Sequence, residues 1–285
     1  MPTTIWIDGQ YCDRDSAKVS VFDHGLLYGD GVFEGIRAYD GKLFRLRQHL
    51  ERLYDSAKSI DLTIPMSLAE LTTVTEEALG RSGITDAYLR HIVTRGVGDL
   101  GLDPRHCPKP TVILIVDTIK LFRTEVLERG LAVITAGTPI PQREALSPRV
   151  KSLNYLAHIM AKLEGINAGA DDVLMLDSGG TVAEGSGQNV FIVKRGVLKT
   201  PPPWAGILQG VTRDAVLELA AGLGIPTQET MLNRYDVYTA DEAFFTGTAS
   251  EMVAIRTLDG REIGTSWPGT VTKQLQTAFA RLVRS

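Results

Sequence analysis

Cysteine is scarce in this chain, and its scarcity limits the chemistry available to the protein. Only Cys12 and Cys107 occur among the 285 residues, far apart and outside any CxxC or Cys/His pattern. A structural zinc site needs such a pattern, so no metal site is predicted. Reduced thiols are expected, as in a cytosolic compartment.

Long apolar runs and clusters of basic residues are missing too. No run of about 18 apolar residues could cross a bilayer, and residues 1–10 lack the basic and apolar regions of an export signal. The formal net charge is −4, and the 30 Lys and Arg residues are dispersed, whereas a nucleic-acid site needs a clustered basic face. The chain is therefore predicted to be cytoplasmic, with neither a membrane nor a nucleic acid as partner.

The usual nucleotide motifs are also absent. There is no Walker A sequence, and the segment 185–190 reads G-S-G-Q-N-V rather than a dinucleotide fingerprint. The sequence therefore contains neither of the motifs that usually indicate ATP or NAD binding. The 44% hydrophobic and 22% charged residues that are present are typical of a globular protein, and the length favours two domains.

The first half of the chain begins with strands. Asp40-Gly41 lies between β-type runs at 32–39 and 42–46, and a DG pair in this position predicts a two-residue hairpin turn. Apolar residues then recur at helical spacing over 46–60, which predicts an amphipathic helix with one face for a sheet.

A second helix is predicted by its ends. Ser67 followed three residues later by Glu70 is typical of a capping box, and Gly83 is placed to end the helix. Two more strands are predicted at 87–95 and 111–116. This half therefore has helix-on-sheet, α+β character.

The second half reads as short strands separated by turns, with helices between them. This pattern predicts a compact, barrel-like β core surrounded by helices. The predicted domains are 1–119, a linker at 120–129, and 130–285. Strands are expected at 131–137, 172–176, 181–184, 189–194, 197–200 and 242–246, and helices at 154–168, 212–221 and 268–282.

Two glycine-containing turns could bind a phosphate. Gly210 would let the backbone approach an anion, and Thr212 would cap the following helix and donate its hydroxyl. Residues 247–250 form a small-residue turn after an apolar strand, where backbone amides could converge. On motif grounds alone, an ordinary capped helix and an ordinary turn explain both segments as well.

Two ionisable residues lie in apolar surroundings. Lys151, between Val150 and Leu153 and just before a helix, is in a setting that favours the neutral, nucleophilic amine needed for a Schiff base. Glu184 ends an apolar strand at a glycine-rich turn, where a buried carboxylate would need a cationic partner such as a protonated pyridine nitrogen. The alternatives are a solvated surface lysine and an exposed turn glutamate.

Tyr88 and Arg90 share one face of their strand, because side chains alternate with period two. A phenol beside a guanidinium can hold a substrate carboxylate, although an Arg in a β-rich core is more often part of a salt bridge. Four further residues could either pack in the core or line a substrate pocket: Tyr28, Phe33, Gly35 and Arg37.

These segments, in this order, resemble the fold-type IV enzymes that use pyridoxal phosphate (PLP), and most closely the branched-chain amino acid aminotransferases. The resemblance covers nearly the whole chain. The segments that carry it are V-F-D-H-G-L-L-Y-G-D-G-V-F-E-G-I-R-A-Y at 21–39, H-L-E-R-L-Y-D-S-A-K at 49–58, K-S-L-N-Y-L at 151–156, E-G-S-G-Q-N-V-F at 184–191, G-V-T-R-D-A at 210–215 and T-G-T-A-S-E at 246–251.

The resemblance implies a PLP site at these positions. Lys151 would form the Schiff base with the cofactor and then act as base and acid in the proton shift. Glu184 would pair with the pyridine nitrogen and keep the ring an electron sink, and Tyr155 would hydrogen-bond the phenolic oxygen. The phosphate would be held by side-chain and backbone donors of Arg52, Val211, Thr212 and Thr248.

The resemblance also implies a substrate site. The α-carboxylate would lie near Tyr88 and the amides of Thr248 and Ala249, and Arg90 would bind the distal carboxylate of glutamate or 2-oxoglutarate. Leu100 and Leu102 match a loop that closes over the neighbouring subunit's pocket, so a homodimer or a higher oligomer is implied. The side-chain pocket would be lined by Tyr28, Phe33, Gly35 and Arg37.

The implied reaction is transamination of leucine, isoleucine and valine with 2-oxoglutarate, by a ping-pong mechanism that gives branched-chain 2-oxo acids and L-glutamate. The implied fold is α+β, with a small sandwich-like α/β N-terminal domain and a larger pseudo-barrel C-terminal domain. One pocket must accept an apolar tail and then a charged one, which apolar walls and one peripheral Arg can do.

Three positions depart from the family pattern. Leu121-Phe122 replaces a linker tyrosine that many members have, His91 stands where proline is frequent, and Gln188 stands where some members have an acid. Three alternatives therefore stay open: a D-amino acid aminotransferase, which the run K-S-L-N also resembles, an aminodeoxychorismate lyase, and a noncatalytic PLP-binding protein.

Overall fold

The computed structural model describes residues 3–285, so Met1 and Pro2, which belong to the predicted first domain, lie outside the described residues. The chain divides into two compact units. The first unit runs to Ile119 and also includes Val150–Asn154 and Arg284. The second unit comprises Lys120–Arg149, Tyr155–Val283 and Ser285.

The predicted linker contains a helix. Helix α4 (Thr124–Arg129) lies inside the segment 120–129, which is part of the second unit. Phe122 and Val126 pack against the apolar core of that unit. These two side chains thus bury part of their surface, which a solvated linker would leave exposed.

The segment Val150–Asn154 belongs to the first unit, although the sequence predicted it in the second domain. The reason is backbone pairing with β3 (Gly31–Tyr39). The Phe33 amide donates to the Lys151 carbonyl over 2.9 Å. Lys151 is therefore held by a strand that lies more than a hundred residues earlier in the sequence.

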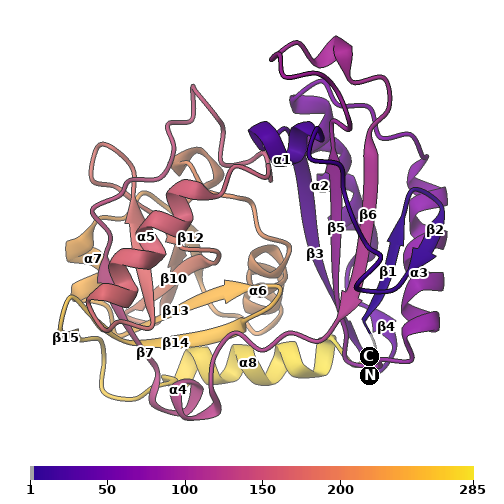
Figure 1. Ribbon diagram of the computed structural model, residues 1–285. Helices are drawn as coiled ribbons and strands as arrows, with labels where there is room; N and C mark the ends of the chain where they lie inside the picture. Colours follow the sequence, from indigo (N-terminus) through magenta and orange to yellow (C-terminus); the bar gives the residue numbers. More distant parts are fainter. Residues whose placement is uncertain (1–2) are drawn as a thin grey trace. The chain divides into compact units, whose positions relative to one another are not determined.

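The first unit is a six-stranded sheet with the order β2-β1-β6-β5-β3-β4, and all its neighbouring strands are antiparallel. Besides β3 it contains β1 (Thr4–Ile7), β2 (Gln10–Cys12), α1 (His24–Tyr28), β4 (Lys42–Leu43), α2 (Leu46–Ser59), α3 (Leu68–Ser82), β5 (Tyr88–Thr94), a 3-10 turn at Pro104–His106 and β6 (Thr111–Asp117). Figure 1 shows α2 and α3 beside this sheet.

The two helices of this unit form its core with the sheet. Leu50 and Leu53 of α2 and Leu71 of α3 are completely buried. They belong to one apolar cluster that includes Ile36 and Leu89 of the sheet. Burial of each such side chain contributes about 1.5 to 3 kcal/mol, so this cluster is the main stabilising element of the unit.

The predicted turns and caps of the first unit are confirmed. Asp40 and Gly41 have φ values of 49° and 79°, and positive φ at both positions is typical of a type I′ hairpin turn. Ser67 and Glu70 form the capping box of α3, and Gly83 ends the helix with a φ of 64°. Local chemistry therefore sets these element boundaries.

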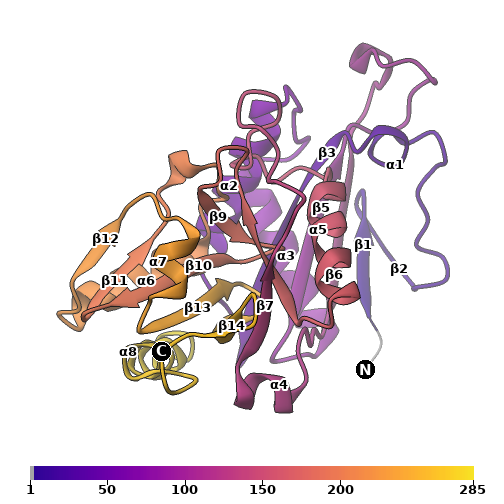
Figure 2. The ribbon, with the colours of Figure 1, turned by 90° about the vertical axis from the view of Figure 1, so that its left-hand side faces the viewer.

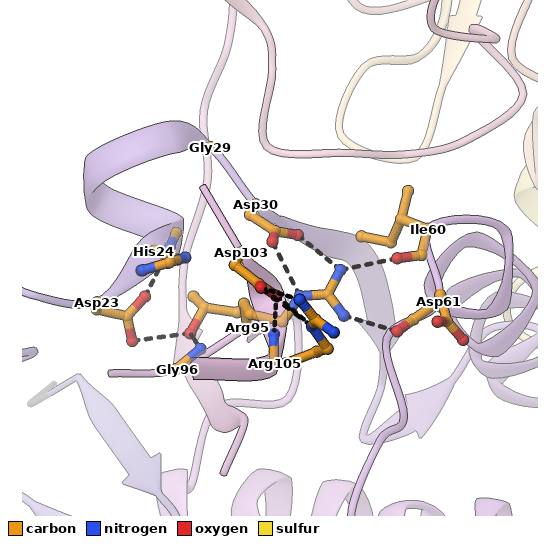
Figure 3. Close-up of polar contacts among 12 residues, drawn as sticks. Asp23, His24, Gly29, Asp30, Ile60, Asp61, Arg95, Gly96, Asp103 and Arg105 are labelled. Atoms are coloured by element: carbon orange, nitrogen blue, oxygen red, sulfur yellow. Dashed lines mark hydrogen bonds and ion pairs between the residues drawn. The ribbon is translucent and has the colours of Figure 1, made fainter. Parts of the chain in front are cut away.

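A buried arginine joins three segments of the first unit, as Figure 3 shows. The Arg95 guanidinium donates to both carboxylate oxygens of Asp30, over 2.8 and 3.0 Å. It also donates to the carbonyls of Ile60 and Asp61, at the end of α2, over 2.7 and 2.6 Å. Because a bidentate Arg–Asp pair has a fixed geometry, Arg95 fixes the chain just before β3 relative to α2.

The second unit contains nine strands and five helices within the described residues. Its strands are β7 (Leu131–Thr135), β8 (Asp172–Leu176), β9 (Val182–Gly185), β10 (Asn189–Lys194), β11 (Val197–Thr200), β12 (Thr227–Glu229), β13 (Glu242–Gly247), β14 (Glu251–Leu258) and β15 (Arg261–Glu262). Its helices are α4, α5 (Leu156–Asn167), α6 (Val211–Gly222), α7 (Arg234–Tyr238) and α8 (Thr270–Leu282), with a 3-10 turn at Pro203–Ala205.

Six of these strands close into a ring. They run in the order β10-β13-β14-β7-β8-β9, and β9 pairs back with β10. The closing pair is Glu184 opposite Asn189. The predicted barrel-like core is confirmed, and Figure 2 shows its strands from the side. Closure gives β9 a neighbour on each side, so neither of its edges stays unpaired.

Strand β14 was not predicted from the sequence. Four consecutive residues, Met252–Ile255, are buried in it, so the period-two pattern of a half-exposed strand is missing. One side of β14 contributes to the apolar core, and the strand also contacts α8, which runs alongside it in Figure 1. Among the described residues, no helix is long and apolar enough to span a membrane.

Candidate active site

Lys151 lies in an extended segment beside β3. Its backbone N–H donates to the Ser56 hydroxyl of α2 over 3.2 Å. Its half-buried side chain places Nζ 4.3 Å from the centroid of the Phe33 ring. The N–H groups of an amine over an aromatic face are attracted by the negative face of the ring, so Phe33 helps to orient the amine.

Gly35, two residues further along β3, leaves room for Tyr88. A Cβ atom at Gly35 would lie only 2.1 Å from the Tyr88 hydroxyl oxygen. Gly35 is paired with Arg90 of β5, and Arg90 Nη2 donates to the Tyr88 hydroxyl over 3.0 Å. The predicted residues Phe33, Gly35, Tyr88 and Arg90 thus form one group, with the Arg90 guanidinium 4.7 Å from the Phe33 ring centroid.

Arg90 has no carboxylate partner among residues 3–285. Its Nε is buried without a hydrogen-bond partner in the same part of the chain. Withdrawing a cation from water without a counter-charge is costly, and the Arg90 side chain is half-buried. The salt-bridge alternative for Arg90 is therefore excluded within the described residues, and the group fits an anionic ligand.

The opposite face of β3 carries a residue for which the sequence patterns predicted no role. Glu34 is completely buried, and its carboxylate accepts bonds from Arg52 Nε and Nη2 over 2.6 and 2.9 Å. His49 Nδ1 lies 2.8 Å from the same carboxylate. Period-two alternation from Phe33 and Gly35 would have placed Glu34 on this face.

The charge of Glu34 is maintained by its neighbours. Burial works to raise its pKa, but Arg52 and His49 outweigh burial and hold the pKa of Glu34 well below its usual range. For His49, burial has the opposite effect and lowers the pKa. The Glu34 carboxylate works to raise the pKa of His49, and the positive charges of Arg52 and Lys151 lower it further. Arg52 is thus oriented by an ionised carboxylate.

Next to Glu34 in the sheet lies His91, one of the departures noted above. The two residues are paired between β3 and β5. The Thr75 hydroxyl donates to the Leu71 carbonyl and lies 2.9 Å from His91 Nε2, so Nε2 carries the hydrogen of the neutral ring. Nδ1 has no partner among the described residues, and burial lowers the pKa of His91 to about 4.

Of the remaining predicted pocket residues, Arg37 lies on the same face of β3 as Phe33 and Gly35 and opposite Tyr88 of β5, with its guanidinium 4.9 Å from the centroid of the Tyr39 ring. The Tyr28 hydroxyl donates to the Leu100 carbonyl over 2.5 Å, so Tyr28 and the loop with Leu100 and Leu102 form a separate group. Both leucine side chains are largely exposed.

In the second unit, the buried Glu184 lies at the closure of the strand ring. Its Oε2 accepts bonds from Asn189 Nδ2 over 3.2 Å and from the Leu208 amide over 3.1 Å. Its Oε1 lies 3.9 Å from His158 Nε2. The exposed-turn alternative for Glu184 is therefore wrong, because its side chain is buried where β9 pairs with β10.

The predicted phosphate turn at the start of α6 differs in detail from the prediction. The helix begins at Val211, one residue earlier than expected, and Gly210 is its N-cap, so Thr212 does not cap it. No side chain caps this helix. A Cβ at Gly210 would lie 2.1 Å from Asn189 Oδ1, which explains the glycine. The first-turn amides therefore fit a phosphate.

The second predicted turn joins β13 to β14. Thr248 and Ala249 lie in it, and both are half-buried. The hydroxyls of Thr246 and Ser250 on either side are buried without a partner among the described residues. Buried hydroxyls normally have a partner, so this turn fits a polar ligand such as the phosphate of PLP.

The other departures have structural partners. Gln188 donates to Asp172 over 3.2 Å, and Lys162 Nζ lies 3.3 Å from the same carboxylate group. Phe122 packs against the core of the second unit, so it takes part in packing where the family pattern has a polar phenol.

Comparison with known proteins adds independent evidence. The family model described as amino-transferase class IV matches residues 31–258. A protein of Methanocaldococcus jannaschii is 50% identical over 275 residues, which cover 96% of this chain and 94% of that protein. The branched-chain-amino-acid aminotransferase of Pseudomonas aeruginosa is 40% identical over 284 residues, which cover 98% of this chain and 92% of that protein.

A solved structure has the same fold. The T.th. branched-chain amino acid aminotransferase, complexed with N-(5'-phosphopyridoxyl)-L-glutamate, matches with a TM-score of 0.94 and 34% identity, and the match covers 99% of this chain and 94% of that one. The predicted two-part α+β fold of type IV is thereby confirmed.

Proposed function

The chain belongs to the amino-transferase class IV family, and from this premise we propose that it is a PLP-dependent branched-chain amino acid aminotransferase. It transfers the amino group of L-leucine, L-isoleucine or L-valine to 2-oxoglutarate and releases a branched-chain 2-oxo acid and L-glutamate. The similar enzyme of Pseudomonas aeruginosa and the phosphopyridoxyl-glutamate complex of the T.th. enzyme support the reaction, the cofactor and glutamate as a substrate.

PLP, when bound, supplies an electron sink for the bond broken at the substrate's Cα. The residues of this chain would hold it and move the proton. Lys151 would hold the cofactor at its aldehyde carbon through Nζ and would carry the proton to and from the substrate. Glu184 would hold the ring nitrogen and Tyr155 the phenolic oxygen. The phosphate would be held by Arg52, the first turn of α6 with Val211 and Thr212, and Thr248.

The observation that carries the choice of substrates is Arg90 beside Phe33. The guanidinium has no protein carboxylate among the described residues and lies against an aromatic ring. A leucine side chain can pack on the ring, and the distal carboxylate of 2-oxoglutarate can pair with the guanidinium. Tyr88, with the amides of Thr248 and Ala249, holds the α-carboxylate in this proposal, and Gly35, Arg37 and Tyr28 complete the side-chain pocket.

We also propose that the protein is a homodimer or a higher homo-oligomer. Helix α5 exposes an apolar stripe at helical spacing, and such a stripe is typical of a helix that packs against a partner. The exposed Leu100 and Leu102 would cover the pocket of the neighbouring copy. The residues of the stripe are Leu156, Ile159, Met160, Leu163 and Ile166, which are between 44% and 69% exposed.

The proposed location is the cytoplasm. Cys12 and Cys107 are both free, which is compatible with a reducing compartment.

The test uses purified protein with PLP, 2-oxoglutarate and a panel of L- and D-amino acids, with enantiomer-resolved detection of glutamate. Formation of L-glutamate from L-leucine, L-isoleucine and L-valine is expected. Preference for D-alanine or D-glutamate would instead indicate a D-amino acid aminotransferase, and pyruvate without amino exchange would indicate a lyase. In Lys151→Ala, loss of the visible absorption of the bound cofactor and of all transfer is expected, whereas a borohydride-reducible adduct in this variant would assign the covalent bond to another lysine.

A further inference from the structure

His158 has no role in the site as proposed above, yet it contacts two of its residues. Its ring stacks on Tyr155, with centroids 4.6 Å apart and an angle of 24° between the planes. Its Nε2 faces Glu184 Oε1 at 3.9 Å. The side chain is only 11% exposed, and Nδ1 is buried without a hydrogen-bond partner among residues 3–285.

We propose that His158 is a positioning residue for PLP, which holds the Tyr155 ring by stacking and directs a ring N–H toward the Glu184 carboxylate. This inference rests on the proposed function, because Tyr155 and Glu184 would act together only on a bound cofactor. One side chain of α5 would then restrain the groups that contact the phenolic oxygen and the ring nitrogen of PLP.

His158 and two of the hydrogen-bond donors of Glu184 face different oxygens of its carboxylate. Asn189 and Leu208 both donate to Oε2, whereas His158 faces Oε1. The distance of 3.9 Å exceeds a direct hydrogen bond, so the imidazole acts as a nearby dipole or through one water. An N–H directed at a carboxylate stabilises its negative charge, and a negative Glu184 is the form that pairs with a protonated ring nitrogen.

Packing alone does not explain a histidine at this position. A purely structural ring would leave no unpaired nitrogen, because buried polar atoms normally have partners. His158 instead leaves Nδ1 unpaired among the described residues while Nε2 faces the carboxylate. A phenylalanine would keep the stacking without that cost, so the nitrogen facing Glu184 is the feature that favours histidine.

The experiment separates the two contributions with two variants of the apo protein, titrated with PLP. His158→Phe keeps a ring for Tyr155 but removes the N–H, and His158→Gln keeps an N–H but removes the ring. The measured quantities are the Kd for PLP and the visible absorption band of the bound cofactor. Asn167→Ala, at the exposed end of α5, is the matched control, and the Tm of each apo protein reports folding.

For His158→Gln, the loss of an aromatic pair is expected to weaken PLP binding about 2- to 10-fold, with an absorption band close to that of the wild type. For His158→Phe, a nearly unchanged Kd with a shifted band is expected. Wild-type Kd and band in both variants would overturn the proposal, as would equal losses in both that follow a lowered apo Tm. If the wild type bound no PLP, the proposed function would fail as well.

Discussion

Two arginines of the first unit, Arg52 and Arg90, have opposite surroundings. Arg52 is held by the buried carboxylate of Glu34 through two bonds. Arg90 is bonded to a neutral phenol and has no acid among the described residues. In the proposed site, Arg52 meets the same phosphate in every turnover and can be fixed in advance, whereas Arg90 meets a charged tail in only one half-reaction and must be able to pair with it then.

The largest expected effect comes from breaking the ion pair between Arg52 and Glu34. Glu34→Gln removes the negative charge and leaves Arg52 as a poorly paired cation, which is expected to cost about 3 to 5 kcal/mol of unfolding free energy. PLP binding should weaken in parallel. Urea denaturation of the apo protein measures the first effect, and PLP titration measures the second.

Glu51→Gln is the matched control, because Glu51 pairs with the exposed Arg47 on the same helix. A surface pair contributes at most about 1 kcal/mol. If the Glu34 variant were no less stable than this control, the ion pair between Arg52 and Glu34 would not stabilise the fold.

The next effect concerns pH. The pKa of His91 is lowered from 6.5 to about 4 in the folded chain. Between these two pH values, the imidazole is therefore protonated in the unfolded chain and neutral in the folded chain. Stability is therefore lost as pH falls from 6.5 to 4, by about 3 kcal/mol from this residue. Denaturation at pH 7 and pH 4.5 measures the loss.

His91→Leu should reduce this acid sensitivity, because the variant has no proton to gain at that position. His106→Gln is the control, since His106 is exposed. Glu34, whose pKa is depressed, also loses its stabilising effect in acid, but at pH values below its ordinary range, so the two contributions can be separated. An equal acid sensitivity in His91→Leu and the wild type would contradict the prediction.

Substitution of Arg90 tests the second arginine of the comparison. Arg90→Met is expected to lower kcat/KM for 2-oxoglutarate by about 100-fold, equivalent to one lost charge-assisted pair, and to change the leucine half-reaction by less than about 3-fold. Single-turnover kinetics of each half-reaction measure both values. Equal losses for both substrates would contradict a selective role for Arg90.

The smallest effect is expected from adding a side-chain atom at Gly35, beside Tyr88. In Gly35→Ala, the new Cβ would clash with the Tyr88 hydroxyl, and such overpacking costs about 1 to 3 kcal/mol. The displaced Tyr88 should raise KM for every amino acid, because it holds the α-carboxylate in the proposed site. Gly80→Ala, on an open surface of α3, is the control, and it should leave KM unchanged.

Much of the first unit could be predicted from the sequence because its signals are local. The turn at Asp40-Gly41 and the ends of α3 depend on residues within a few positions of one another. Lys151 and Glu184 could be singled out because their neighbours in sequence are apolar or glycine-rich. Period-two spacing likewise grouped Tyr88 with Arg90, which the structure joins by a hydrogen bond.

Only the tertiary structure decided the partners of these residues. Strand β14 is covered on both sides and so lacks alternation, and Lys151 joins the first unit through pairing with β3. Glu34 meets Arg52, and His158 faces Glu184, across 18 and 26 positions. The sequence by itself determined the local turns, the helix ends and the residue types that carry chemistry. Long-range strand pairing and burial determined which of them meet, because these contacts form only when distant segments pack together.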